Sequence, residues 1–183
     1  MNSLRARYRA PSHRARKKVI NRLDTHFRAF RAHSPFVVIG TSATDDGSGD
    51  VSPRGDEPGF VRIDDDKTIL IPDRPSNNRL DTLSNIVENP EISVLFLIPG
   101  FSETLRMNGR AMVTDDTAVL ARLSMGGKPA LMAIRVEIRE AYLHCNRAIC
   151  RARLWDEDSR PDRAILPGAG RMTNEMTNRP GDR

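Results

Sequence analysis

The chain has 183 residues, of which 38% are hydrophobic and 29% charged, and its formal net charge is +5. This length suits one domain rather than two, and no apolar run approaches the ~20 residues of a membrane helix. Residues 1–18 lack the apolar stretch of a secretory signal, and two cysteines, Cys145 and Cys150, are too few for a disulfide framework. The composition therefore predicts a cytoplasmic protein with reduced thiols and no membrane partner.

The positive charge is concentrated at the start of the chain. Residues 1–18 contain seven arginines and lysines and no acid, so the remainder is close to neutral. A basic run of this kind also fits nucleic-acid binding, but Tyr8 is its one aromatic residue, which leaves little for stacking on bases. We interpret residues 1–18 as a solvated basic arm and expect no nucleic-acid partner.

The first elements of the chain follow from hydrophobic spacing. Apolar residues between Val19 and Phe30 recur at helical intervals, which predicts an amphipathic helix over 17–32 that stops before Pro35. A β-branched run over 36–41, a polar glycine-bearing turn and a second run from Val51 then predict a hairpin.

Alternating and continuous apolar runs continue through the chain. They predict further strands over 60–63, 68–71, 92–98, 104–114 and 130–142, with helices over 77–88, 116–125 and 146–155. Gly109 is expected to form a β-bulge, and Asp115 and Asp116 are expected to cap the second of these helices. Residues 159–183 are rich in Pro, Gly, Asn and Arg, which predicts an extended or disordered tail. The fold class is mainly β: a closed or half-open antiparallel barrel of six to seven strands with flanking helices.

Two short segments have residues suited to an anion. After the strand that ends at Ile71, the chain turns and enters a predicted helix, and Arg74, Asn78 and Arg79 lie in this turn. Guanidinium groups and the amides of a helix start both bind phosphate, although a solvated turn before a capped surface helix fits equally well. Arg54 lies between Pro53 and Gly55 at a strand end, where it is either a ligand contact or a charged hairpin edge.

The order of several motifs along the chain makes the functional interpretation of these segments more specific. In sequence they are Ser52–Asp56, Gly59–Val61, Asp73–Pro75, Asn77–Thr82, Asn89–Pro90, Glu103–Arg110, Leu143–Cys145 and Arg153–Asp156. Together they resemble the pyridoxamine 5′-phosphate oxidase-like family, and within it an uncharacterised bacterial branch of FMN-binding proteins. The resemblance extends over about residues 24–167.

The resemblance implies an FMN-binding split β-barrel over 19–158 that forms a homodimer with two FMN molecules at its interface. It implies that Arg79, with Asn78 and Arg74 beside it, binds the FMN phosphate and that Arg54 contacts the flavin. It further implies that five residues approach the cofactor from the partner subunit or from a C-terminal segment that closes over it: Glu103, Thr104, Arg106, Arg153 and Trp155.

The function implied by the resemblance is an FMN-dependent oxidoreductase acting on an unidentified small molecule, with no catalytic side chain assigned. The C-terminal basic and aromatic motif of the vitamin-oxidising members is missing, so pyridoxamine phosphate is not the expected substrate. The alternative is a non-catalytic carrier or sensor of flavin, haem or the deazaflavin coenzyme F420, because one fold serves many functions. His144 next to Cys145 is interpreted as a cap or interface residue rather than a metal ligand.

Overall fold

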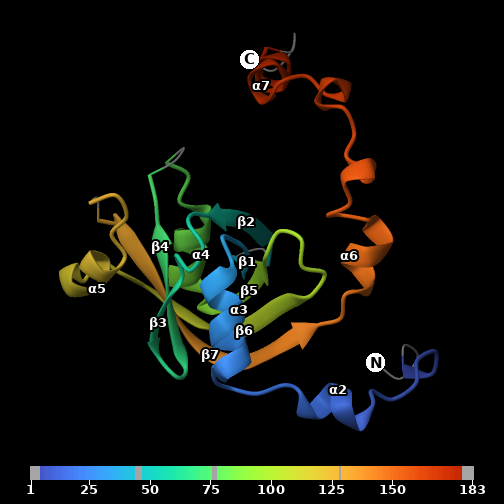
Figure 1. Ribbon diagram of the computed structural model, residues 1–183. Coiled ribbons are helices and arrows are strands. Elements are labelled where there is room, and N and C mark those ends of the chain that lie inside the picture. Colours follow the sequence, from blue (N-terminus) through green and yellow to red (C-terminus); the bar gives the residue numbers. More distant parts are fainter. Residues whose placement is uncertain (1–4, 44–46, 76–77, 128, 179–183) are drawn as a thin grey trace.

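The computed structural model describes residues 5–43, 47–75, 78–127 and 129–178. Its sheet contains seven antiparallel strands in the order β2-β1-β5-β6-β7-β4-β3, which confirms the predicted antiparallel barrel (Figure 1). The strands are β1 (Phe36–Ser42), β2 (Gly49–Gly55), β3 (Arg62–Asp65), β4 (Thr68–Asp73), β5 (Glu91–Leu97), β6 (Thr104–Thr114) and β7 (Met132–His144). The predicted hairpin is the pair β1–β2.

The chain also contains short helices. They are α2 (His13–Lys17), α3 (Thr25–His33), α4 (Asp81–Glu88), α5 (Thr117–Arg122), α6 (Arg147–Ala152) and α7 (Ala169–Thr177), with 3₁₀ turns at Glu157–Ser159 and Arg163–Ile165. Within the described part of the chain, no helix has the length and apolarity needed to cross a membrane.

The N-terminal region differs from the predicted helix over 17–32. Helix α3 begins at Thr25, where the Asp24 carboxylate accepts a hydrogen bond from the Phe27 amide at 2.8 Å. Before it, Ile20 pairs with Ala141 through two backbone hydrogen bonds of 3.0 and 2.6 Å. The predicted single helix is therefore wrong, because backbone pairing with β7 and the Asp24 cap interrupt the helical spacing.

The central strands agree more closely with their predictions. Strand β6 has the predicted limits, its register shifts at Gly109 as expected of a bulge, and the Asp116 carboxylate caps α5. Strand β4 continues through Pro72, where an end was predicted. The proline is tolerated because β3 pairs with β4 only up to Leu70, so the missing amide at Pro72 faces no partner strand.

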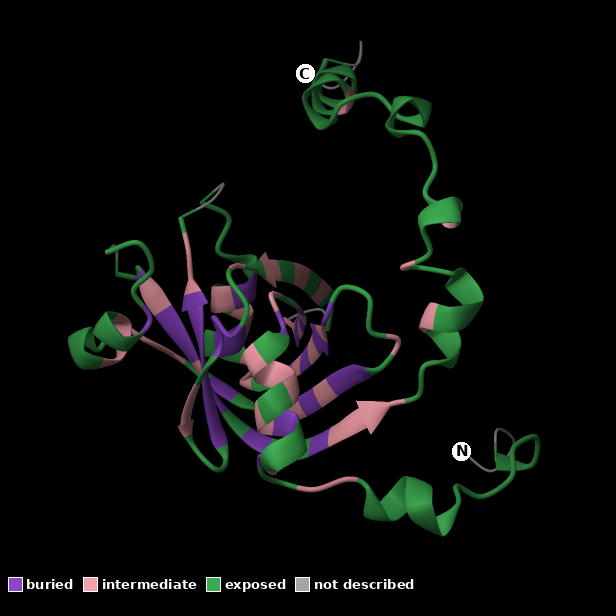
Figure 2. Ribbon diagram, in the orientation of Figure 1, coloured by how far each residue is buried: buried purple, intermediate pink, exposed green. Residues whose placement is uncertain are grey.

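The core fills the barrel between the strands and two helices. Alternate residues of β1 and β5 point inward and are fully buried, and Phe27 of α3 and Ile86 of α4 join the same cluster. Figure 2 shows this buried interior against the exposed chain ends. The arm before α3 and the segment after β7 extend away from the barrel (Figure 1). That C-terminal segment includes α7 as well as extended chain.

Candidate functional site

A cleft of about 740 Å³ lies where β2 approaches β4. These two strands are separated in the sheet order and form no backbone ladder, so the barrel is split along this line. We call this line the seam and the hollow along it the seam cleft. Residues of β2, the turn after it, the end of β4 and the segment 78–82 line the cleft, together with Leu131.

Two crossed ion pairs join the strands across the seam. Arg54 of β2 lies 3.6 Å from the Asp73 carboxylate at the end of β4. In the opposite direction, Nε of Arg74, just after β4, donates to the Asp56 carboxylate just after β2 at 3.1 Å. Side chains therefore connect strands that share no backbone hydrogen bonds.

The segment after Arg74 brings two further predicted residues to the cleft. Asn78 has a left-handed backbone (φ +59°), which asparagine tolerates better than most residues. Arg79 follows it, contacts Asp81 at 2.7 Å, and has a side chain 73% exposed. Helix α4 begins only at Asp81, later than predicted, because Asn78 breaks the helical backbone. Asn77, the predicted start, lies outside the described residues.

The charges of the cleft are close to balanced. Its described lining contains the three arginines 54, 74 and 79 and the four aspartates 50, 56, 73 and 81. Asp50 accepts a hydrogen bond from the Thr82 hydroxyl at 3.1 Å. Burial raises the pKa of Asp73, and the nearby Arg54 guanidinium partly opposes this shift. An incoming anion therefore meets arginines that already have carboxylate partners.

The other predicted cofactor residues form a second group around the start of β6. Thr104 and Arg106 lie on β6, and Glu103 directly precedes it. Trp155 donates from its indole nitrogen to the Phe101 carbonyl at 2.7 Å. Arg153 follows the last residue of α6 and contacts Asp156 at 2.7 Å. Neither Arg153 nor Trp155 lines the seam cleft.

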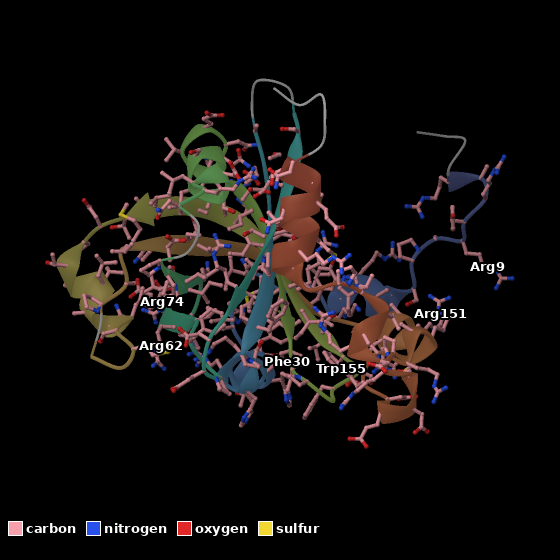
Figure 3. All side chains as sticks on the ribbon, turned by 90° about the horizontal axis from the view of Figure 1, so that it is seen from above. Arg9, Phe30, Arg62, Arg74, Arg151 and Trp155 are labelled. Carbon is pink, nitrogen blue, oxygen red and sulfur yellow. The ribbon has the colours of Figure 1, made fainter. Side chains whose placement is uncertain are left out.

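The two groups lie apart within one chain. Figure 3 shows Arg74 and Trp155 on opposite sides of the barrel. The structure therefore brings Arg54, Arg74, Asn78 and Arg79 together in one cleft and places the remaining five predicted residues elsewhere.

The second group contains a cationic and aromatic cluster that the sequence did not predict. The Tyr142 ring lies 5.4 Å from Nζ of Lys18 and 5.8 Å from the Arg106 guanidinium carbon, and His144 lies beside the ring. Burial, with Arg106 and Lys18 nearby, lowers the pKa of His144. No three His, Cys, Asp or Glu side chains among the described residues gather as a metal site requires.

A second groove, of about 850 Å³, lies at the β3–β4 turn, and its described lining contains the two arginines Arg110 and Arg135. Arg135 in its lining contacts Asp64, and Arg110 lies 3.9 Å from Glu91. The seam cleft is thus the better anion site, because its arginines come from both sides of one opening.

Sequence analysis missed Asp56 and Asp73 as site residues. Both lie within the motifs that suggested a cofactor, one residue or two from an arginine. Arg54 with Asp56 and Asp73 with Arg74 are complementary pairs on two strand ends. The presence of an arginine and an aspartate at both strand ends could have indicated these contacts from the sequence. Only the folded structure shows that each arginine pairs with the aspartate of the other strand end.

The profile of the family described as pyridoxamine 5′-phosphate oxidase matches residues 23–145, about two thirds of the chain. This chain belongs to the pyridoxamine 5′-phosphate oxidase family. The seven antiparallel strands form that family's split-barrel fold. No curated protein sequence matches the chain.

Solved structures share the fold of this family member at low sequence identity. HupZ of Group A Streptococcus superposes with a TM-score of 0.54 at 14% identity, covering 66% of this chain and 93% of HupZ. A putative pyridoxamine 5′-phosphate oxidase of Lactobacillus delbrueckii gives 0.51 at 15% identity, covering 67% and 95%. An FMN-binding protein of Syntrophomonas wolfei gives 0.51 at 12% identity, covering 64% and 83%.

Proposed function

We propose that this chain is an FMN-dependent oxidoreductase that binds the cofactor's phosphate in the seam cleft and acts on a small molecule. The observation that carries the proposal is the convergence of Arg54, Arg74, Asn78 and Arg79 on one cleft. Membership of the pyridoxamine 5′-phosphate oxidase family and the fold shared with the FMN-binding protein of Syntrophomonas wolfei support it.

The donors of the cleft fit a phosphate group. Among its contacts with the described residues Arg74 uses Nε, for Asp56, which leaves its two terminal amino groups to meet two phosphate oxygens. Asn78 adds an amide donor, and Arg79 a guanidinium at the cleft entrance. These residues would hold the phosphate, and Arg54 would contact both the phosphate and the flavin.

The chemistry in this proposal comes from the cofactor. Bound FMN supplies hydride and electron transfer, while the protein supplies binding, orientation and electrostatics. The described lining of the seam cleft contains no His, Cys or Tyr side chain. Hydride transfer at a flavin requires no such group, so this lining is compatible with the proposed reaction class.

We further propose that the protein acts as a homodimer, because an apolar row lies on the outer face of the sheet. Val37, Ile39, Val94 and Phe96 point inward and are fully buried, so their neighbours on β1 and β5 face outward. This outer row consists of Phe36, Val38, Val51, Leu95 and Leu97, in which Phe36 is 38% and Val51 is 71% exposed. Exposed apolar rows of this kind mark protein interfaces.

The dimer would also account for the separation of the two groups of residues. Within one chain, Trp155 and Arg106 lie away from the seam cleft. A second copy packed on the outer row would bring its own Glu103–Arg106 strand and α6 end toward this chain's cleft. Each FMN would then be held by the seam cleft of one subunit and the second group of its partner.

The alternative function is a carrier or sensor that binds flavin, haem or the coenzyme F420 without turnover. The cleft chemistry recognises a phosphate and does not by itself distinguish among flavin cofactors. Titration with FMN and with F420 separates the two cofactors. Oxidation of NADH or NADPH in the presence of an electron acceptor separates an enzyme from a carrier.

The first experiment is an absorption spectrum of the purified full-length protein, before and after addition of FMN. We expect a flavin spectrum, with FMN released on denaturation and identified by chromatography. A colourless protein that takes up no added FMN would overturn the proposal.

A further inference from the structure

The two ion pairs across the seam differ in how firmly each carboxylate is held. Both oxygens of the Asp56 carboxylate are hydrogen-bonded: one accepts from Arg74 at 3.1 Å and the other from the Glu57 amide at 2.8 Å. Its side chain is only 4% exposed. Because both oxygens of this nearly buried carboxylate are hydrogen-bonded, the contact between Asp56 and Arg74 is a fixed one.

The contact between Arg54 and Asp73 is looser. At 3.6 Å it exceeds hydrogen-bonding distance, and within the described residues the Asp73 carboxylate accepts no hydrogen bond. Arg54 directs its other amino group to the Pro53 carbonyl at 3.0 Å and to the Ser52 hydroxyl on its own strand. Both side chains are about one fifth exposed, at 22% and 18%, so a ligand in the cleft can reach this pair.

We propose that Asp73 is an exchangeable carboxylate, which the phosphate of the cofactor displaces from Arg54, while Asp56 remains in place and aims Arg74 at the same phosphate. This inference rests on the proposed function. Asp56 is a positioning residue and Asp73 a specificity residue: a ligand without phosphate, such as riboflavin, has no group to take Arg54 from Asp73. Binding of the phosphate thus replaces one of the two links across the seam.

Exchange makes phosphate binding depend on the protonation of Asp73. The charged groups facing it across the cleft are Arg54 and Asp50 of β2, Asp56 of the turn after β2, Arg74 and Arg79 of the segment before α4, and Asp81 at the start of α4. Burial raises the pKa of Asp73, so on acidification it becomes neutral earlier than an ordinary aspartate. Arg54 is then released to the ligand without competition.

The test compares wild type, Asp73→Asn and Asp56→Asn in the full-length protein, with FMN affinity measured by flavin fluorescence at pH 8 and at acidic pH. At pH 8 we expect Asp73→Asn to bind FMN roughly fivefold more tightly than wild type and Asp56→Asn at least tenfold more weakly. The ratio of wild-type to Asp73→Asn dissociation constants should fall toward one on acidification. Using a ratio cancels the ionisation of the ligand phosphate, whose second pKa is about 6.

Two further variants give the controls. The gain from Asp73→Asn should vanish when Arg54 is already alanine, because the exchange acts through Arg54. If Asp56→Asn fails to fold, Asp56→Glu replaces it and should keep more than half of the wild-type affinity. Equal or weaker FMN binding by Asp73→Asn at pH 8, or a ratio that does not change with pH, would overturn the exchange.

Failure of the proposed function gives a different result. If neither wild type nor any variant binds FMN, the proposed function is overturned and inorganic phosphate becomes the probe, followed by phosphorus NMR. Tighter phosphate binding by Asp73→Asn than by wild type would still support the exchange. Equal binding, or no binding by either protein, would overturn it.

Discussion

The arginines of the seam cleft pair with carboxylates that are buried to different degrees. This difference predicts which arginine contributes more to binding a ligand. Arg74 is 25% exposed and is oriented by the nearly buried Asp56, whereas Arg79 is 73% exposed beside the half-exposed Asp81. A guanidinium fixed by a buried partner loses less conformational entropy when it binds a ligand. Arg74 is therefore expected to contribute more to phosphate binding than Arg79, which the family resemblance placed first.

Replacing Arg74 by alanine tests this order. Loss of a charged hydrogen bond to phosphate costs about 2 kcal/mol, so FMN affinity should fall roughly 30-fold. Arg79→Ala should lower it about fivefold, because contacts of exposed charges contribute less. The measurement is titration of FMN by fluorescence for each variant.

Arg62→Ala is the matched control for both variants. Arg62 is an exposed arginine on β3 that does not line the cleft. Its removal should leave FMN affinity within a factor of two of wild type. A larger loss for Arg79→Ala than for Arg74→Ala would contradict the order argued from burial.

At the scale of the element, strand β6 depends on a bulge that only glycine permits. The register between β6 and β7 shifts between Asn108 and Gly109. A Cβ at Gly109 would overlap the Glu137 carbonyl oxygen and lie 3.0 Å from the carbonyl carbon. The bulge shifts the pairing with β7 by one residue between the two halves of β6, and Thr104 and Arg106 lie in the half before it. It therefore sets their register against β7.

Gly109→Ala should therefore destabilise the protein by about 3 kcal/mol, because the backbone of β7 has to move to admit the methyl group. The measurement is urea unfolding followed by circular dichroism. Gly49→Ala on β2 is the control, since a Cβ there meets no atom within 4 Å. The control should stay within about 0.5 kcal/mol of wild type. Equal stability of the two variants would show that β7 adapts freely.

At the scale of the whole molecule, apolar side chains are exposed on two parts of the described chain. One is the outer apolar row of β1, β2 and β5, and the other is the segment after β7, where Leu154, Ile165 and Leu166 are between 48% and 63% exposed. This segment and the basic arm lie outside the residues that match the family, at 23–145. A second copy of the chain would cover the row, and the site would then combine two subunits.

Val51→Asp tests the proposed dimer. An unpaired charge in an apolar interface is costly, so the variant should elute as a monomer and lose most of its FMN affinity. Sedimentation velocity gives the mass, and fluorescence titration the affinity. Val87→Asp on α4 is the control, because Val87 is equally exposed, at 76% against 71% for Val51, and lies off the outer row. A monomeric wild type, or dimeric Val51→Asp, would contradict the proposal.

The sequence by itself determined the strands and their order along the chain. Local pattern is sufficient where one face of a strand is buried, as in β1 and β6, and where a turn or bulge needs glycine, as at Gly109. It failed before α3, where residues at helical spacing instead pair with β7 near Ala141. Such pairing joins residues far apart in the chain, so local periodicity does not encode it.

Arg74 and Arg79 were predicted as an anion site from their place in a strand-to-helix turn together with the family resemblance, and the tertiary structure decided what surrounds them. Arg54 and Asp73 come from strands that form no ladder, and they meet only because the barrel leaves a seam between β2 and β4. The same closure leaves Arg106 and Trp155 outside the seam cleft. The sequence gives the chemistry of each side chain, but the partner of each charge depends on how the sheet closes into a barrel. That closure exists only in the folded chain.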